Sequence, residues 1–370
     1  MTGNKLRWGF LSTAQIGRKN WKAIRNSGNG VIVAVASRDA KRSQEFIANC
    51  QRECSFDAPP RALGSYEELL AATDVDAVYI PLPTGIRKEW VIRAAQAGKH
   101  IVCEKPCANS VDELREMIET CRQHKVQFID GVMFMHSRRL DAMRAVLNDG
   151  VNVGQIKRIT SAFSFCAPDE FFAGNIRANG ALEPFGCLGD LGWYCIRFAL
   201  WVMNWQMPRS VTGRMLAKVG ETSSASPTNA VPTEFSGELL FDNGVSSGFY
   251  CSFLTQNEQW AYVSGSKGYL RLNDFVAPFF GSELKFEVNN CAHNVIGCDF
   301  NMEPHWKKYA VPEYGNSHPT AQETNLFRNF ANQVRTGELN DEWPAWALKT
   351  QQVMEACFRS AQKDSRLIEV

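Results

Sequence analysis

Up to Met135, the chain alternates short apolar runs with helical patterns, and this alternation restricts the fold more than any other feature. The apolar runs cover residues 6–11, 31–36, 77–81, 100–103 and 126–129. Continuous apolar runs are typical of strands that are covered on both faces. Helical patterns lie between them, at residues 16–25, 40–50, 66–72, 88–97 and 111–124. This order predicts right-handed βαβ units and an α/β fold with a doubly wound parallel sheet.

The second half of the chain has hairpin signals instead. Asp242-Asn243-Gly244 separates strand patterns at 233–241 and 245–253, and the turn at 265–268 separates patterns at 260–264 and 269–272. A further strand pattern covers residues 155–165. Helical patterns cover 140–148, 322–334 and 346–361, and residues 220–232 have the composition of a surface loop. We therefore expect a C-terminal α+β domain built on a large, mostly antiparallel open sheet.

Composition excludes several classes of function. Lys and Arg total 40 against 39 Asp and Glu, which argues against a nucleic-acid binder and gives no electrostatic case for a membrane surface. The opening residues lack the apolar core of a secretory signal, and the most apolar stretch is too short to span a bilayer. The 12 cysteines include no C-x-x-C pair, so we expect reduced thiols in a cytoplasmic protein. The six scattered histidines predict no metal site.

The turn after the first apolar run carries small residues. Ser12, Ala14 and Gly17 take the three glycine positions of a G-x-G-x-x-G dinucleotide loop, so only the third is glycine. Small side chains still let the backbone approach a pyrophosphate, and the hydroxyl of Ser12 or Thr13 can donate to phosphate. The helix that opens at Ile16 would add its N–H groups. Taken alone this is an ordinary strand-to-helix turn, but its place in the first βαβ unit favours a dinucleotide.

The end of the second predicted strand bears on which dinucleotide would bind. An NAD enzyme typically carries an acidic residue there, to bind the ribose 2′-hydroxyl. This chain has Ser37 and Arg38, which can hydrogen-bond and pair with a 2′-phosphate. These residues favour NADP, while Asp39 leaves NAD open as an alternative.

Two more motifs carry candidate catalytic groups. Lys105 follows the fourth predicted strand, and ligands of open α/β sheets bind at the carboxyl ends of strands. Asp190 and Tyr194 are four residues apart, so on a helix they share one face and can together hold a substrate hydroxyl. The alternative is an acid placed by the helix dipole and a tyrosine packed into the core.

Taken together, the motifs resemble the glucose-fructose oxidoreductase / inositol dehydrogenase / rhizopine-catabolism (Gfo/Idh/MocA) family of nicotinamide-dependent oxidoreductases. The resemblance covers essentially the whole chain. It is carried by residues 8–17, 81–84, 104–106, 131–133, 189–194 and 265–271. Within the family, one branch carries a tyrosine where many other members have histidine, and Tyr194 resembles that branch. It contains glucose-fructose oxidoreductase, sugar dehydrogenases and dihydrodiol dehydrogenase.

The resemblance implies a role for each matching residue. Lys105 would polarise the reacting hydroxyl or carbonyl, and Tyr194, assisted by Asp190, would exchange the proton. A phenol has an ordinary pKa near 10, which the Lys105 ammonium and a helix N-terminus would lower. The implied cofactor-binding residues are Ser12, Thr13, Ala14, Ile16, Gly17, Ser37, Arg38, Pro81, Leu82, Pro83, Thr84, Glu104 and Lys105. The implied substrate-binding residues are Lys105, Met133, Phe134, Arg177, Asp190 and Tyr194.

The implied activity is hydride transfer between nicotinamide C4 and a sugar, polyol or cyclic diol. Residues 1–130 would form the Rossmann dinucleotide-binding domain, and residues 131–370 the domain for substrate binding and for assembly into a dimer or tetramer. Two other functions remain open: an NAD-dependent glycoside hydrolase that oxidises its sugar transiently, and a cofactor-binding sensor without turnover. Arg87 stands where relatives usually have histidine, and Arg177 could bind substrate or only brace its loop, so the substrate stays open.

Overall fold

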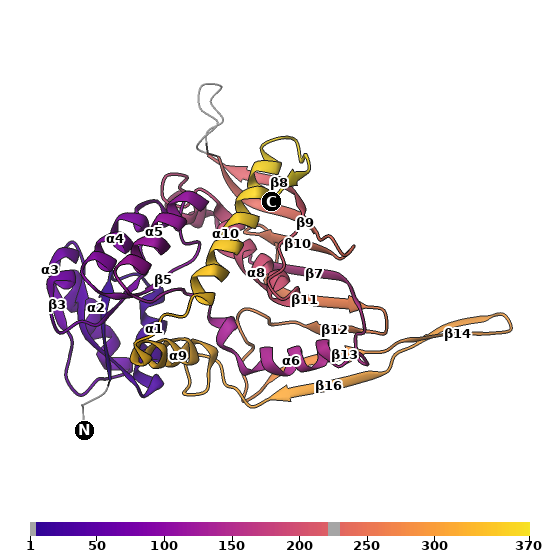
Figure 1. Ribbon diagram of the computed structural model, residues 1–370, viewed down its shortest axis with the longest axis horizontal. Helices are drawn as coiled ribbons and strands as arrows, with labels where there is room; N and C mark the ends of the chain where they lie inside the picture. The colour runs from indigo at the N-terminus through magenta and orange to yellow at the C-terminus, as the bar shows by residue number, and fades with distance from the viewer. Residues whose placement is uncertain (1–4, 221–229) are drawn as a thin grey trace. The chain divides into compact units, whose positions relative to one another are not determined.

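The computed structural model describes residues 5–220 and 230–370, which form two compact units (Figure 1). The first unit contains the described residues up to His136, together with Ala181–Pro184 and Tyr314–Gln351. The second unit contains Ser137–Gly180, the described part of Phe185–Glu313, and Gln352–Val370. Each unit is built on its own β-sheet.

A six-stranded parallel sheet forms the centre of the first unit, in the order β3-β2-β1-β4-β5-β6. Its strands are β1 (Leu6–Leu11), β2 (Gly30–Ala36), β3 (Arg61–Leu63), β4 (Ala77–Ile80), β5 (His100–Cys103) and β6 (Phe128–Asp130). The predicted doubly wound parallel sheet is confirmed. Strand β3 was missed, because three residues that include an arginine form no apolar run.

Helices connect these strands: α1 (Ile16–Ser27), α2 (Ala40–Glu53), α3 (Tyr66–Ala71), α4 (Thr84–Gln96) and α5 (Val111–Gln123). Helix α4 begins at Thr84 rather than at the predicted residue 88. The reason is a distant carboxylate: Glu183 accepts the backbone N–H of Thr84 at 3.0 Å and so satisfies a group that the helix itself leaves unpaired. A pattern read along the chain contains no trace of this contact.

A C-terminal segment braces the first helix. Helix α9 (Gln322–Thr336) packs against α1, where Lys19 Nζ lies 2.6 Å from the buried carboxylate of Glu323. The ring of Phe327 on α9 meets Trp8 of β1 edge-on, with 5.2 Å between centroids. Helix α1 is therefore fixed by residues some three hundred positions away in sequence.

A nine-stranded sheet forms the second unit, in the order β16-β13-β12-β11-β7-β10-β9-β8-β17. Its strands are β7 (Ile156–Ser164), β8 (Ser210–Val219), β9 (Val231–Leu240), β10 (Ser246–Ser252), β11 (Glu258–Gly265), β12 (Tyr269–Leu272), β13 (Leu284–Asn289), β16 (Trp306–Val311) and β17 (Ile368–Glu369). Both predicted hairpins, β9–β10 and β11–β12, are present. Only β7 and β10 pair in parallel among its described strands. The mostly antiparallel sheet is thus confirmed, although β8, β13 and β16 were not predicted.

Helices cover one face of this sheet. Helix α6 (Arg138–Asn148) packs on β13 and β16, and α8 (Trp193–Val202), which is buried along its length, packs on β7 and β10. None of the residues described in the short α7 (Asp169–Gly174) is buried. Helix α10 (Glu342–Ala361) follows α9, and the hairpin β14 (Ala292–Ile296) and β15 (Asp299–Glu303) extends from the ends of β13 and β16 (Figure 1). The greater part of the predicted loop at 220–232 lies outside the described residues.

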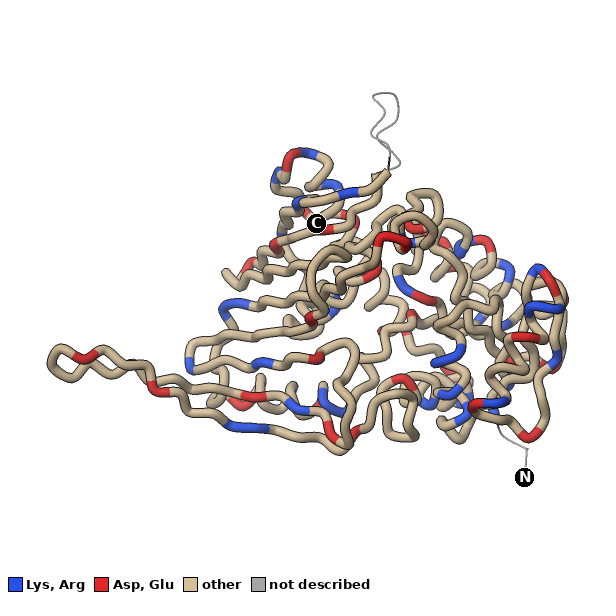
Figure 2. The backbone as a smooth tube through the Cα atoms, turned by 180° about the vertical axis from the view of Figure 1, so that it is seen from behind, with Lys and Arg blue, Asp and Glu red and all other residues tan. Residues whose placement is uncertain are grey.

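The distribution of charged residues along the chain agrees with the balanced composition. Basic and acidic residues alternate along both units, without a long segment of one sign in the part of the chain that is drawn in colour (Figure 2). All cysteines are free, and three of them, Cys166, Cys291 and Cys298, are exposed. None of the helices formed by residues 5–220 and 230–370 combines the length and apolarity that crossing a bilayer requires.

His100 at the start of β5 makes the stability of the first unit depend on pH. Its Nδ1 accepts the Gln127 N–H at 2.9 Å, which requires an unprotonated nitrogen. Burial lowers the pKa of His100 below its ordinary value of 6.5, and the charge of Asp76 offsets this only in part. As the pH falls below about 6.5, the unfolded chain binds a proton that the folded protein does not, so stability falls.

We expect urea denaturation to reveal this dependence. Between about pH 7.5 and 5.5, the wild type should lose more stability than His100→Asn, by up to about 1.4 kcal/mol per pH unit. An equal loss in both proteins would contradict the assignment to His100.

Candidate functional site

The turn between β1 and α1 has the geometry of a dinucleotide loop without its first two glycines. Ser12 adopts φ 134°, a backbone conformation that glycine tolerates best, which costs about 1–3 kcal/mol for other residues. Its hydroxyl oxygen accepts the Ala14 N–H at 3.0 Å and so holds the turn. A Cβ at Gly17 would lie 3.1 Å from the ring of Phe46, so the third glycine lets α1 pack closely.

The N-terminus of α1 differs from that of several other helices in having no side-chain cap within the described part of the chain. Among the described residues, no side chain caps it and no acid lies in its first turn. Side chains do cap α2, α3, α5 and α6. The Gly17 and Arg18 N–H groups donate to the Ala14 and Gln15 carbonyls at 2.9 and 3.0 Å. The positive end of the helix dipole at this terminus suits a phosphate group. Thr13 and Ile16 flank this terminus and are half-buried.

The end of β2 presents the residues that were predicted to select the cofactor. Ser37 is buried and Arg38 is exposed. The carboxylate of Asp39 accepts the Lys41 N–H at 2.9 Å and serves as the N-cap of α2. Asp39 therefore already has a structural role.

The loop after β4 contains Pro81, Leu82, Pro83 and Thr84, and it is almost completely buried. The hydroxyl of Thr84 donates to Glu183 at 2.6 Å, and the Gly85 N–H donates to the Leu182 carbonyl at 2.9 Å. A Cβ at Gly85 would lie 2.2 Å from the Ala181 carbonyl oxygen, so only glycine permits this approach. The segment Ala181–Pro184 is thus fastened to the start of α4.

The loop after β5 carries Glu104 and Lys105. The hydroxyl of Tyr79 on β4 donates to Glu104 at 2.6 Å, and burial, followed by the charge of Glu104, raises the pKa of Tyr79. A Cβ at Gly131 would lie 3.0 Å from the Glu104 carboxylate, so glycine leaves room for that side chain. Lys105 itself is half-buried, and its peptide bond to Pro106 is cis.

Candidate residues of the second unit lie around an irregular helical turn. Asp190 sits in a π-helical turn (Leu188–Gly192) that leads into α8, rather than in the regular helix that the spacing predicted. Such turns are frequent at functional sites. Arg177 Nε lies 2.8 Å from Asp190 Oδ2. Tyr194 follows in the first turn of α8, 7% exposed, with its ring edge-on to Phe163.

The structure therefore groups the predicted residues in two sets. One set lies at the carboxyl ends of β1, β2, β4 and β5 in the first unit, and the other links Arg177, Asp190 and the start of α8 in the second. Met133 and Phe134 form a 3-10 turn after β6, where Phe134 is buried and Met133 packs on the core. No group of three or more His, Cys, Asp or Glu that could hold a metal occurs within the described residues.

Three residues that hold the loops of the candidate site were not predicted as site residues. Tyr79 lies within the apolar run at 77–81 and was not singled out, yet its hydroxyl donates to Glu104. Glu183 has no local motif, and only tertiary structure joins it to Thr84. Arg87 was noted only as a departure from the family, yet it is 2% exposed.

Comparison with known proteins agrees with both units. Residues 6–132 match an oxidoreductase family with an NAD-binding Rossmann fold, and residues 140–271 match the GFO/IDH/MocA C-terminal domain. D-xylose 1-dehydrogenase (NADP(+)) 2 of Haloferax volcanii is 31% identical over 77% of this chain and 81% of the relative. Trans-1,2-dihydrobenzene-1,2-diol dehydrogenase of Mus musculus is 30% identical over 80% of this chain and 83% of the relative.

Solved structures show the same fold. An aldose-aldose oxidoreductase from Caulobacter crescentus, complexed with glycerol, has a TM-score of 0.78 and 21% identity over 99% of this chain and 100% of its own. A 3-ketoreductase from Actinomadura kijaniata has a TM-score of 0.77 and 22% identity, covering 96% and 98%. With two matching domain models and two relatives aligned over most of their length, the chain belongs to the Gfo/Idh/MocA family of oxidoreductases.

Proposed function

We propose that the protein is an NADP-dependent dehydrogenase or reductase that transfers a hydride between nicotinamide C4 and a sugar, polyol or cyclic diol. The observation that carries the proposal is the uncapped, acid-free N-terminus of α1 directly after β1. The positive end of its helix dipole suits a pyrophosphate. The names of the xylose and dihydrodiol dehydrogenases support the class of substrate.

The cofactor is assigned to the carboxyl edge of the parallel sheet. Ser12 to Gly17 would hold the pyrophosphate, the segment 81–84 and Glu104 would flank the nicotinamide half, and Ser37 and Arg38 would bind the 2′-phosphate. The capping role of Asp39 supports NADP over NAD, because its carboxylate already accepts a hydrogen bond from α2. A bound nicotinamide supplies the hydride donor or acceptor. Residues 1–130 are accordingly assigned to the dinucleotide and 131–370 to substrate and assembly.

Proton transfer is assigned to Tyr194 and polarisation of the reacting oxygen to Lys105. When the substrate is oxidised, its hydroxyl proton passes to the tyrosine phenolate as hydride leaves the carbon, and reduction runs the same steps in reverse. The ion pair of Arg177 with Asp190 keeps the carboxylate of Asp190 oriented beside the start of α8, where it would accept a hydrogen bond from a substrate hydroxyl. Met133 and Phe134 complete the assigned substrate residues.

Replacing the proposed proton-transfer group should abolish turnover without preventing cofactor binding. We expect Tyr194→Phe to lower kcat about 10²–10⁴-fold, the usual contribution of a positioned acid or base. The dissociation constant for NADPH should stay within about threefold, since the phenol is not assigned to the cofactor. The measurement is the appearance of NADPH at its absorbance band with a panel of sugars and diols, with Tyr314→Phe at an exposed tyrosine as the matched control.

Other outcomes of that panel identify the alternatives. Tightly held cofactor with no net reduction, together with cleavage of a chromogenic glycoside, would replace the proposal with a transiently oxidising hydrolase. Cofactor binding without turnover on any substrate would indicate a sensor. Full activity in Tyr194→Phe would contradict the assignment of Tyr194.

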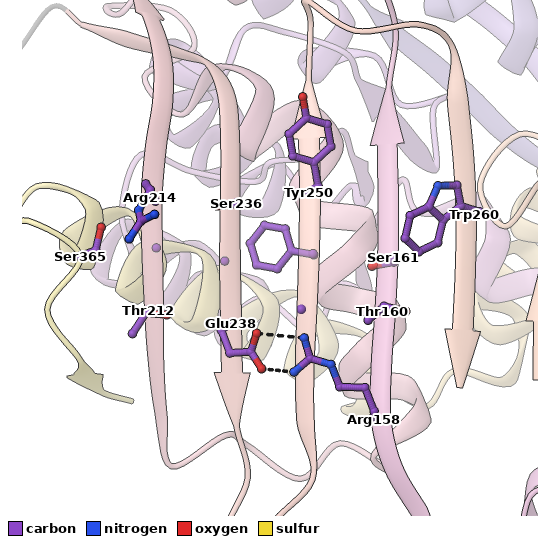
Figure 3. A pocket seen from close by; sticks show the side chains of 14 residues that line it. Arg158, Thr160, Ser161, Thr212, Arg214, Ser236, Glu238, Tyr250, Trp260 and Ser365 are labelled. Carbon is purple, nitrogen blue, oxygen red and sulfur yellow. Dashed lines mark hydrogen bonds and ion pairs between the residues drawn. The ribbon is translucent and has the colours of Figure 1, made fainter. Parts of the chain in front are cut away.

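We further propose that the protein is a homo-oligomer that pairs through the face of the nine-stranded sheet opposite α8. Strand register places Thr160, Glu238, Gly248, Tyr250 and Trp260 on one face. They line a shallow depression of about 490 Å³, which the ion pair of Arg158 with Glu238 crosses (Figure 3). A sheet face this broad is normally covered by another layer.

Sedimentation velocity tests the assembly. We expect a dimer or tetramer for the wild type and a shift toward monomer for Trp260→Asp, because a charge would be buried in the interface. The exposed Leu254→Asp, outside the depression, serves as control. A monomeric wild type at micromolar concentration would contradict the proposal.

A further inference from the structure

Arg87 is a charged side chain in the interior of the first unit. It lies one turn into α4 and is 2% exposed. Burying a guanidinium costs several kcal/mol unless its N–H groups find acceptors. The acceptors around Arg87 therefore indicate what the side chain does.

The guanidinium joins two loops. Nε donates to the Leu82 carbonyl at 3.0 Å, and Nη2 donates to the same oxygen. Nη1 donates to the Pro106 carbonyl and lies 3.3 Å from the Thr84 hydroxyl. Leu82 belongs to the loop after β4, and Pro106 immediately follows Lys105 in the loop after β5. One rigid, planar group thus fixes backbone atoms of both loops.

A carboxylate completes the cluster. Glu183, 9% exposed, accepts from the Thr84 hydroxyl at 2.6 Å and from the Thr84 N–H at 3.0 Å. The same hydroxyl lies 3.2 Å from the Pro106 carbonyl. Thr84 therefore stands between a buried cation and a buried anion. Arg87 and Thr84 contact the main chain beside Lys105, and Glu183 holds Thr84 in place.

We propose that Arg87 is a positioning residue for Lys105, which it holds in register with the loop after β4 by hydrogen-bonding the Leu82 and Pro106 carbonyls simultaneously. This inference rests on the proposed function, since it concerns the lysine assigned to polarise the substrate oxygen. Arg87 acts through the backbone and needs no contact with the substrate. Displacement of a reacting group by about 1 Å can cost about 10²-fold in rate.

Arginine suits this position for a reason that histidine does not share. A neutral imidazole has one N–H, so it can serve only one of the two carbonyls, whereas a guanidinium has five and remains protonated. A histidine at position 87 would donate to both loops only when protonated, below about pH 6.5.

Kinetics of variants test the proposal. We expect Arg87→Gln to lower kcat about 10- to 100-fold, with the dissociation constant of NADPH within about threefold of wild type. The activity of Arg87→His relative to wild type should rise as the pH falls from about 8 to 6, while that of Arg87→Gln should not. Arg93→Gln, at an exposed arginine on the same helix, is the matched control.

A second pair covers the case in which Arg87 variants fail to fold. Thr84→Val removes the hydroxyl between Pro106 and Glu183, and Thr84→Ser restores it. We expect the valine variant to lose about tenfold in kcat and the serine variant to recover most of it. Equal rates in the two variants, or an unchanged kcat in Arg87→Gln, would overturn the positioning role.

A readout without substrate separates this inference from the proposed function. The rate at which acetic anhydride modifies Lys105, followed by mass spectrometry with exposed lysines as internal standards, should change at least about threefold in Arg87→Gln, because the reactivity of an amine depends on its surroundings. If the wild type binds no NADP or transfers no hydride, the proposed function fails, yet this rate still reports on Lys105. An unchanged rate in a folded Arg87→Gln variant would overturn the inference.

Discussion

The proposed chemistry depends on one constraint: in a parallel sheet, the loops that follow the strands all lie at the same side of the sheet, at the carboxyl ends of the strands. In the first unit the chain runs outward from β1 in one direction and from β4 in the other. The loops after these strands therefore diverge at the carboxyl edge, where ligands of open α/β sheets bind. That edge holds the uncapped N-terminus of α1, the residues after β2 and the loop with Lys105 after β5, so all three can face one ligand.

Buried polar contacts then fix these loops. The Tyr79 hydroxyl donates to Glu104 and so joins β4 to the loop after β5. The guanidinium of Arg87 donates to one carbonyl in each of the loops after β4 and β5 and so joins these two loops. An unsatisfied buried group costs about 1–3 kcal/mol, so each contact is strongly preferred over its absence. Ser12 combines a cost with a gain. Its φ of 134° is one that glycine would adopt more easily, but its hydroxyl oxygen accepts a hydrogen bond from the Ala14 N–H.

Periodicity and turn chemistry predicted that both sheets are present but not all of their strands, and the motifs predicted the family. Apolar runs located β1, β2, β4 and β5 because strands buried on both faces need uninterrupted apolar residues. Two features could not be predicted from the sequence: the contact of Glu183 with the start of α4, and the π-helical turn around Asp190. The first is a tertiary contact across ninety-nine positions, and the second is a local irregularity that leaves no periodic signal. The assigned roles of Lys105 and Tyr194 remain predictions.

Titration of the protein with NADPH and NADH, followed by quenching of tryptophan fluorescence, tests the central claim most directly. The account predicts that NADPH binds about tenfold more tightly than NADH, and that Arg38→Ala removes this difference by weakening NADPH alone, since a charge-assisted contact to the 2′-phosphate is worth about 1.5–3 kcal/mol. Equal affinities in the wild type would contradict the assignment of Ser37 and Arg38. The absence of binding by either nucleotide would contradict the cofactor site itself.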